Sequence, residues 1–304
     1  MASPTIINTM TKYAQGIFQE KSNRIVEIIA PSVATGSANF TIPNYSKRSA
    51  FQVPNARRAI GGDSKAVVSE QGKIDVTLKP YALHDVIDEH EMVQASTAEG
   101  KMLLRKARIK NLISQAGNSR LNETLTQIRG EIAATPENWG ANADPIKQLD
   151  QKILDIYRSS GVMPNKILMS MGAWIIFKNN AEVKKLFTAS NPKRKDAVIM
   201  VSDVGALLLN QNIKVIVEDS IFDTPLNSPE DKDFALNSEV WIYNQSEDAN
   251  MFDASSFKTF KIKDNAFSAV KAVEQNYGER WDVSWTEVPF VNNASSAMRL
   301  TITV

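Results

Sequence analysis

The stretch "NWGANADPIKQLDQKILDIYRSSGVMPNKILMS", residues 138–170, decides the fold class of this chain. Asp144 followed by Pro145 is typical of a helix start, because aspartate caps the free amides and proline needs no amide donor there. Apolar residues then recur at helical spacing, at Ile146, Leu149, Ile153 and Ile156. Gly161 predicts the end of the helix, and the run "NKILMS" after it predicts a buried strand. A helix and a strand in this order form the unit of an α/β layer.

The same stretch contains no histidine, no cysteine and no glycine-rich phosphate loop. Similar elements follow it along the chain. The segments "GAWIIFKNNAEVKKLF" and "SDVGALLLNQN" predict short helices, "IKVIVED" and "EVWIYN" predict strands, and residues 223–238 predict a loop. We therefore predict one α/β unit over residues 140–245.

Composition bounds the class of protein. The 304 residues are 43% hydrophobic, which is enough for a sizeable core. With 35 basic and 34 acidic residues the net charge is +1, which excludes a strongly basic nucleic-acid binder. The absence of cysteine excludes disulfides and thiolate metal sites. No apolar run approaches the roughly 18 residues that span a membrane, and no secretory signal is evident, so we expect synthesis in the cytosol.

Prolines recur in the part of the chain that precedes the predicted α/β unit. Residues 1–24 have a mixed pattern that admits a short helix, whereas residues 24–62 contain Pro31, Pro43 and Pro54 and predict a long extended arm. An arm of this length gains order by lying on another surface, often another subunit. Residues 63–92 then predict a β-hairpin: "EQGK" supplies a turn, and the apolar residues alternate. The alternating residues are Ile74, Val76 and Leu78.

A long helix is expected from the Ser96 and Glu99 capping box to about Ile132, since no proline interrupts it. It carries two apolar stripes. The first contains Ala98, Met102, Ile109, Ile113 and Ala116, and the second contains Leu121, Leu125, Ile128 and Ile132. The offset between them falls at Gly117, so either the helix kinks there or its halves pack against different layers. The tail from residue 246 predicts antiparallel strands that return to this helix, with a helix over residues 265–276.

The stretch best suited to catalysis or metal binding is "HDVIDEHE", residues 84–91, which contains both histidines and four carboxylates. His84 and His90 with an acid could bind a divalent metal, although their spacing fits neither a strand face nor a helix face. The alternative is an acidic strand that faces solvent or a partner. We predict no catalytic residue, no cofactor and no metal site.

The stretch "KMLLRKARIK", residues 101–110, has five basic residues and no acid. Three interpretations stay open: contact with nucleic-acid phosphates, a solvated helix face, or pairing with the acidic strand of the same or a neighbouring chain. We predict inter-subunit contacts through charged residues of this stretch, the acidic run and the arm. These residues are Arg57, Arg58, Lys101, Arg105, Arg108, Asp85, Asp88, Glu89 and Glu91.

The order of these segments resembles a known family. The arm contains "IIAPSV" and "FTIPNY", then come "RRAIGG", "KPYALHDVIDEHEM" and the long helix. The opening stretch, "GAWIIF", "AEVKKLF", "SEVWIYN" and "SSFKTFKI" follow in the same order. From about residue 24 to the end, the chain resembles the major capsid proteins of tailed bacteriophages, which have the Hong Kong 97 capsid fold.

The resemblance implies an α+β fold of five segments. Residues 1–50 would be an N-terminal arm, and residues 51–92 an extended hairpin loop. Residues 93–139 would be the spine helix of a peripheral domain, residues 140–245 an α/β axial domain, and residues 246–304 the antiparallel strands of the peripheral domain.

The resemblance also implies partners. Copies would form hexamers and pentamers of an icosahedral shell around double-stranded DNA, bound without sequence specificity. A separate scaffolding protein, a portal and a decoration protein are further expected partners, and no membrane is expected. The shell would be assembled in the cytoplasm of a bacterial host and would become the capsid of the virion.

Two alternatives come from other classes. An encapsulin-type nanocompartment shares the fold but encloses a cargo protein, and the proline-rich arm argues against it. A metal-dependent enzyme would use His84 and His90 with the adjacent carboxylates.

Overall fold

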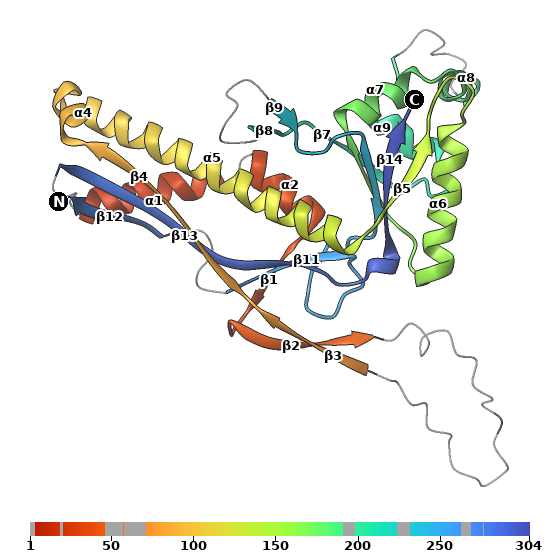
Figure 1. Cartoon of the computed structure of the whole chain (residues 1–304), viewed down its shortest axis with the longest axis horizontal. Coiled ribbons are helices and arrows are strands. Elements are labelled where there is room, and N and C mark those ends of the chain that lie inside the picture. The colour runs from red at the N-terminus through yellow and green to blue at the C-terminus, as the bar shows by residue number, and fades with distance from the viewer. Residues whose placement is uncertain are drawn as a thin grey trace.

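One long helix, α5 (Ala98–Glu131), crosses the molecule and joins its two sheets (Figure 1). The computed structural model describes residues 4–18, 21–45, 57, 71–190, 198–223, 232–262, 269–275 and 277–304. At 1.5 Å per residue the 34 residues of α5 are about 51 Å long. The long helix predicted from the sequence is confirmed.

The N-terminal end of α5 differs from the prediction by one residue. Thr97 is the capping residue, and its side-chain oxygen accepts a hydrogen bond of 3.0 Å from the Gly100 amide. Ser96 has a φ of 34° and belongs to the turn before the helix. The predicted capping box of Ser96 and Glu99 is therefore wrong.

The offset between the two apolar stripes reflects two packing partners and not a break in the helix. The N-terminal half contributes Ile109, Leu112, Ile113 and Ala116 to one cluster. The C-terminal half contributes Leu121, Leu125 and Ile128 to another. Trp281 lies in the first cluster and Trp241 in the second. Because α5 continues through Gly117, the second of the two alternatives is confirmed.

The first sheet packs against α5 and has the order β1-β11-β13-β12, with β4 paired to β13. Its strands are β1 (Ser32–Thr35), β4 (Lys79–Asp88), β11 (Phe257–Ile262), β12 (Ala269–Gln275) and β13 (Gly278–Val291). Alternate residues of β13 are buried, as in a sheet with one face on a core. The helix predicted over residues 265–276 is wrong, because residues 269–275 pair with β13 as a strand. Long-range pairing here overrides the helix propensity of alanine, lysine and glutamate.

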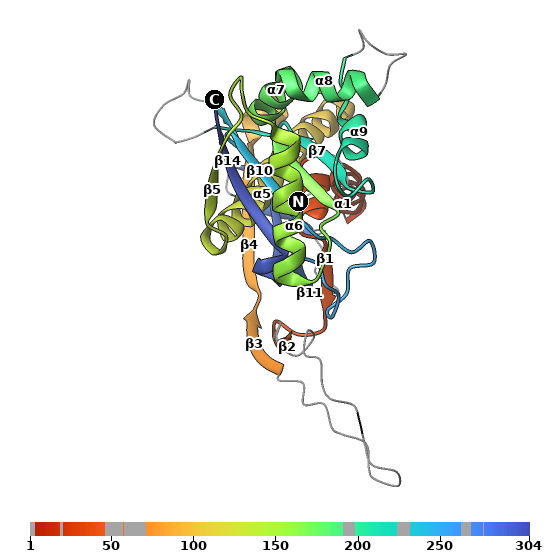
Figure 2. The same cartoon turned by 90° about the vertical axis from the view of Figure 1, so that its right-hand side faces the viewer.

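The second sheet forms an α/β unit with the order β5-β14-β10-β6-β7. Its strands are β5 (Ala134–Asn138), β6 (Lys166–Ser170), β7 (Lys214–Glu218), β10 (Glu239–Tyr243) and β14 (Ala297–Thr303). Its helices are α6 (Pro145–Ser160), α7 (Met171–Asn179), α8 (Ala181–Ser190) and α9 (Val201–Val204), followed by a 3-10 turn at Gly205–Leu207. Figure 2 shows α6 in front of the strands and α7 and α8 across one end.

The predicted caps of this unit are confirmed. Asp144 accepts a hydrogen bond from the Lys147 amide, and Gly161 ends α6 at a φ of 69°. Two features differ from the expectation. The predicted loop over residues 223–238 has a short hairpin at its ends, β8 (Ile221–Asp223) and β9 (Lys232–Phe234). Strand β14, which we expected to return to the long helix, instead pairs with β5 and β10 and completes the second sheet.

The N-terminal segment is helical over residues 4–18, as the pattern of residues 1–24 allowed, and also over residues 21–29, where the predicted extended arm begins. Helices α1 (Pro4–Phe18) and α2 (Lys21–Ile29) precede Pro31, and both contact α5. Met10 and Ala14 of α1 enter the first cluster, and the apolar face of α2 enters the second. The extended arm predicted from residue 24 is therefore wrong over residues 24–29, because α2 buries its apolar face on its own subunit.

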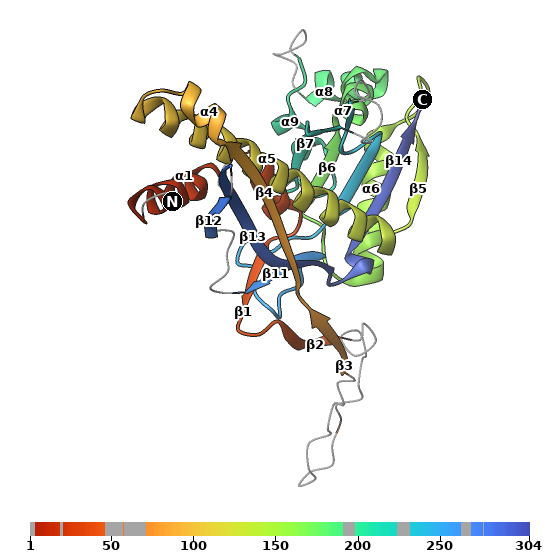
Figure 3. The same ribbon diagram turned by 60° about the vertical axis from the view of Figure 1, so that its left-hand side comes forward.

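A two-stranded hairpin leaves the body at one corner (Figure 3). It pairs β2 (Asn39–Tyr45) with β3 (Gln71–Thr77) antiparallel. The turn predicted at "EQGK" is wrong, because Gln71 and Gly72 already pair with Tyr45 and Asn44. Residues 46–56 and 58–70, which include the rest of the predicted hairpin loop, lie outside the described residues.

The root of this hairpin is apolar. The predicted alternation of Ile74, Val76 and Leu78 is confirmed, since these side chains pack in one cluster with Val33 and Phe260 of the first sheet. After β4 a short helix, α4 (Glu89–Gln94), leads to the start of α5. Over the residues that the structure describes, no helix is both long enough and apolar enough to cross a membrane.

Candidate functional site

Four arginines of α5 pair with carboxylates of the elements packed against it. The pairs are Arg105–Glu279, Arg108–Glu91, Arg120–Glu287 and Arg129–Glu239. Their partners lie on β13, on α4 and on β10. Ion pairs therefore connect α5 to both sheets and to α4.

Arg105 forms a two-bond contact with Glu279 at the start of β13. Its Nε and Nη2 donate hydrogen bonds of 2.8 and 2.6 Å to the two carboxylate oxygens. Only 8% of Arg105 is exposed, so water screens the pair little. The hydrogen bond from Arg105 is the largest cause that lowers the pKa of Glu279 below its usual 4.5.

This pair predicts a specific acid response. A carboxyl group whose pKa is lowered by folding stabilises the folded chain above its usual pKa, and this contribution is lost as the pH falls through the lowered folded-state value. Between about pH 7 and about pH 3, the Glu279→Gln variant should therefore lose less free energy of unfolding than the parent. Urea titrations at both pH values measure this. The exposed Glu89→Gln variant serves as control, and equal losses in the parent and Glu279→Gln would contradict the assignment.

Arg108 brings the basic stretch and the acidic run together within one chain. It donates a short hydrogen bond to Glu91 of α4, and its Nη1 lies 3.9 Å from Asp85 of β4. Of the three interpretations left open for residues 101–110, pairing with the acidic strand of the same chain holds for Arg108, whereas Arg105 pairs with Glu279 of β13. Their additional role between subunits stays a prediction.

The other predicted contact residues lie apart from these pairs. Asp88 caps α4 by accepting a hydrogen bond of 2.8 Å from the His90 amide. Glu89 and Arg57 are exposed, and Lys101 is half-buried. Arg58 lies outside the described residues.

Arg120 is the most buried of the four arginines, and the sequence pattern did not point to it. It is 3% exposed, and its Nε and Nη2 each donate a hydrogen bond of 2.6 Å to Glu287. Glu27 of α2 lies 3.7 Å from Nη2 and also accepts a hydrogen bond from the Ser32 amide. The sequence did contain one indication that Arg120 is buried. Arg120 directly precedes Leu121, and both lie on the buried side of the helix.

The two histidines lie on two different elements. His84 on β4 and His90 on α4 are both exposed, and the Nε2 of His90 lies 3.1 Å from the side-chain nitrogen of Gln94. Among the described residues, which include both histidines, no group of three or more histidine, cysteine or acidic residues could hold a metal ion. The arrangement therefore gives no support to the metal-dependent enzyme.

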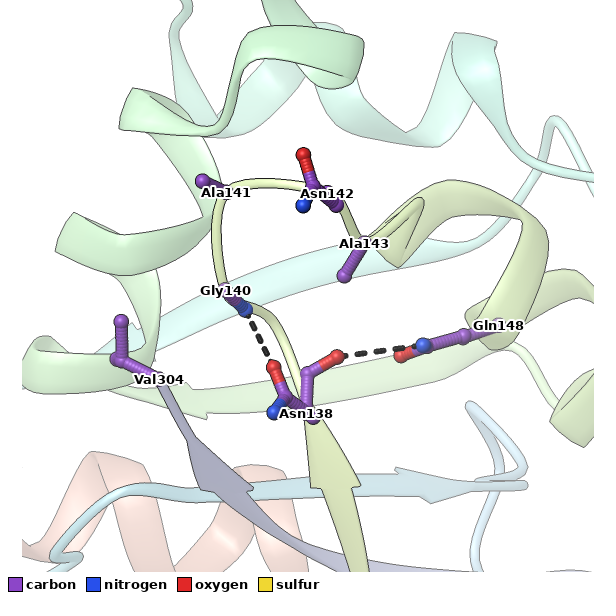
Figure 4. Close-up of a pocket in the computed structure, with 7 residues that line it drawn as sticks. All are labelled: Asn138, Gly140, Ala141, Asn142, Ala143, Gln148 and Val304. Carbon is purple, nitrogen blue, oxygen red and sulfur yellow. Dashed lines mark hydrogen bonds between the residues drawn. The ribbon is translucent and has the colours of Figure 1, made fainter.

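A shallow depression of about 430 Å³ lies beside the start of α6 (Figure 4). Its walls are Asn138, Gly140, Ala141, Asn142, Ala143, Gln148 and Val304. The side chain of Asn138 accepts a hydrogen bond of 2.7 Å from the Gly140 amide, and Gln148 donates one of 3.2 Å to the Asn138 carbonyl. These bonds hold the loop in shape. None of the lining side chains carries a group that ordinarily acts as an acid, a base or a nucleophile.

Comparison with known proteins shows which solved structures have a similar fold. No protein-family model matches the sequence, and no curated protein matches it. A solved phage-related protein from Bordetella bronchiseptica RB50 matches with 16% identity, 96% of each chain covered and a TM-score of 0.71.

Two assembled structures also match. The mature capsid of bacteriophage PhiM1 has 12% identity, covers 90% of this chain and 84% of its own, and has a TM-score of 0.54. The holo-SrpI encapsulin complex of Synechococcus elongatus PCC 7942 has 9% identity, covers 91% and 86%, and has a TM-score of 0.53. These likenesses at low identity concern the fold, and this chain has the fold of bacteriophage capsid proteins.

Proposed function

We propose that this chain is the major capsid protein of a tailed bacteriophage, and that its function is assembly rather than catalysis. Copies form hexamers and pentamers, which close into an icosahedral shell around double-stranded DNA. The observation that carries the proposal is the likeness over 96% of the chain to a phage-related protein, together with the likeness to an assembled phage capsid.

The two sheets correspond to two parts of such a subunit. The first sheet with α5 is the peripheral domain, which residues 93–139 and 246–304 mainly supply. The α/β unit of residues 140–245 is the axial domain, and β5 and β14 complete its sheet. Residues 1–50 and 51–92 supply the N-terminal arm and the hairpin loop. A two-stranded hairpin is marginally stable alone, which supports the idea that the paired strands β2 and β3 gain stability from a neighbouring subunit.

The partners follow from this role. We expect a separate scaffolding protein during assembly, a portal, a decoration protein on the outside and non-specifically bound DNA inside. A net charge of +1 gives the chain as a whole little attraction for phosphates, so we expect its contact with DNA to be weak. Assembly takes place in the cytoplasm of the host bacterium, and the product is the capsid of the virion.

The charged residues predicted to link subunits divide into two groups. Arg105, Arg108, Asp85 and Glu91 already have partners of opposite charge in their own chain, so their part in a contact between subunits is at most shared. Exposed Arg57 and Glu89 stay proposed contact residues, as do Arg58, Lys101 and Asp88.

Negative-stain electron microscopy of the purified recombinant chain, with light scattering on the same sample, tests the proposal. We expect closed shells or rings of subunits, because the fold presents its surfaces for repeated contacts between copies. A chain that stays monomeric at every salt concentration, and also when co-expressed with the neighbouring genes of its genome, would contradict the proposal.

An encapsulin-type compartment is the second candidate, since an encapsulin complex has nearly the same TM-score as the phage capsid. The contents of particles isolated from the natural source separate the two functions. Nuclease-protected double-stranded DNA supports the capsid. A co-purifying protein in place of DNA supports the compartment.

A further inference from the structure

The loop of residues 246–254, between β10 and β11, is held rigidly in one shape. Within it, the side chain of Asp253 accepts hydrogen bonds from the amides of Asn250 and Ser255, at 2.5 and 2.7 Å. Beneath it, the fully buried Lys258 donates hydrogen bonds of 3.2 and 3.0 Å to the carbonyls of Met251 and Asp253. We call these nine residues the acidic loop. Its conformation is set before any partner arrives, so binding would cost little ordering entropy.

The acidic loop presents one aromatic ring between acidic residues. Phe252 is 62% exposed, although Met251 beside it packs against the apolar root of the hairpin. Glu247 and Asp248 are also exposed. The contact of Glu247 with Lys214, at 3.7 Å between two mostly exposed side chains, is worth little in water. A rigid, exposed phenylalanine is typical of an interaction hot spot, and the charge around it favours a basic and apolar partner.

A surface of that kind lies on the N-terminal half of α5. Leu103 is 59% exposed, and Lys106, Ala107 and Lys110 follow it at helical spacing on the same side. We call these four residues the basic face. Among the described residues, no salt bridge pairs Lys106 or Lys110 with a carboxylate, although Lys106 lies over the ring of Tyr13. Two lysines beside an exposed leucine and alanine complement the acidic loop in both charge and apolarity.

One chain cannot join these two surfaces. Figures 1 and 3 both place the N-terminal part of α5, which carries the basic face, away from the segment that precedes β11. We propose that the acidic loop docks on the basic face of a second copy of this chain, with Phe252 beside Leu103 and Ala107. Because two different surfaces meet, the contact is head-to-tail and can repeat from copy to copy into a ring. The inference rests on the proposed assembly of this chain and names a contact within it.

Cysteine cross-linking tests the contact directly, because the natural chain contains no cysteine. The double variant Phe252→Cys with Ala107→Cys, oxidised after assembly, should form a ladder of covalent oligomers on a non-reducing gel. On the same gel each single variant should run as a monomer, because a head-to-tail contact never brings two identical positions together. The matched control pairs Phe252→Cys with Thr126→Cys, an exposed position on the other half of α5, and should also give no ladder.

Charge reversal provides an independent readout. Glu247→Lys with Asp248→Lys, and separately Lys106→Glu with Lys110→Glu, should each lower the assembled fraction, and combining all four changes should restore it. Circular dichroism and thermal unfolding check that each variant folds. Particles without a specific ladder, or reversals without rescue, overturn the docking alone. The absence of both particles and ladder overturns the docking and the proposed function together.

Discussion

Replacing Arg120 by leucine should lower the free energy of unfolding by about 3–5 kcal/mol, the cost of leaving a buried charge without its partner. Arg120 is 3% exposed and Glu287 is 7% exposed, so water cannot take the place of the lost guanidinium. Glu27 would also lose its neighbour, and α2 would hold less firmly to α5. Urea denaturation of the unassembled chain, followed by circular dichroism, measures the change.

Two further variants test the reason for this effect. Arg120→Leu combined with Glu287→Leu should recover part of the lost stability, because no uncompensated charge stays in the core. Lys79→Ala removes the exposed contact of Lys79 with Glu123, at 3.4 Å, and should change stability by about 0–1 kcal/mol. If Arg120→Leu were as mild as Lys79→Ala, the buried pair would not contribute as the geometry implies.

The elements that depend on local signals could be predicted from the sequence. Helix α6 begins and ends where Asp144 and Gly161 predict, because capping depends on neighbours within one turn. The two stripes of α5 predicted either a kink or two packing layers, and the second is present, since the apolar pattern of a helix depends on what each part faces.

Apart from the local misses at the Ser96 capping box and at residues 24–29, the misses are pairings between distant segments. Strand β3 pairs with β2, which lies about thirty residues earlier, and no local turn signal could indicate this partner. Residues 269–275 contain good helix formers, yet β13 makes them a strand. Strand β14 showed the expected alternation, but alternation does not tell which of two sheets a strand joins.

The ion pairs of α5 could likewise be predicted from the sequence only in part. The acidic run and the basic stretch were visible as charge patterns, and Arg108 joins them. The partner of Arg105 is Glu279, far along the chain, and that of Arg120 is Glu287. A charge pattern along the sequence indicates residues that can form ion pairs. Only the fold shows whether the oppositely charged partners lie in the same chain.

The second large effect is expected at Gly278, where β13 begins beside the end of β4. Its φ is 155°, which side-chain-bearing residues rarely adopt, and an added Cβ would lie 2.1 Å from the carbonyl oxygen of Ile87. That neighbour is backbone in the pairing of β4 with β13, so it cannot swing away as a side chain would. Gly278→Ala should therefore lower the free energy of unfolding by about 3 kcal/mol, from backbone strain and from overpacking of about 1–3 kcal/mol each.

The chain offers a matched control of opposite sign. Gly130 lies in the last turn of α5, and an added Cβ there would meet no atom within 4 Å. Gly130→Ala should raise the free energy of unfolding by about 0.5–1 kcal/mol, since alanine loses less entropy in a helix than glycine. Urea titrations of both variants beside the parent measure the two changes. Two shifts of the same sign would contradict the backbone assigned to one of the glycines. Because Gly278 lies where β13, β4 and α4 meet, its variant should also misplace α4 and the Glu91 partner of Arg108.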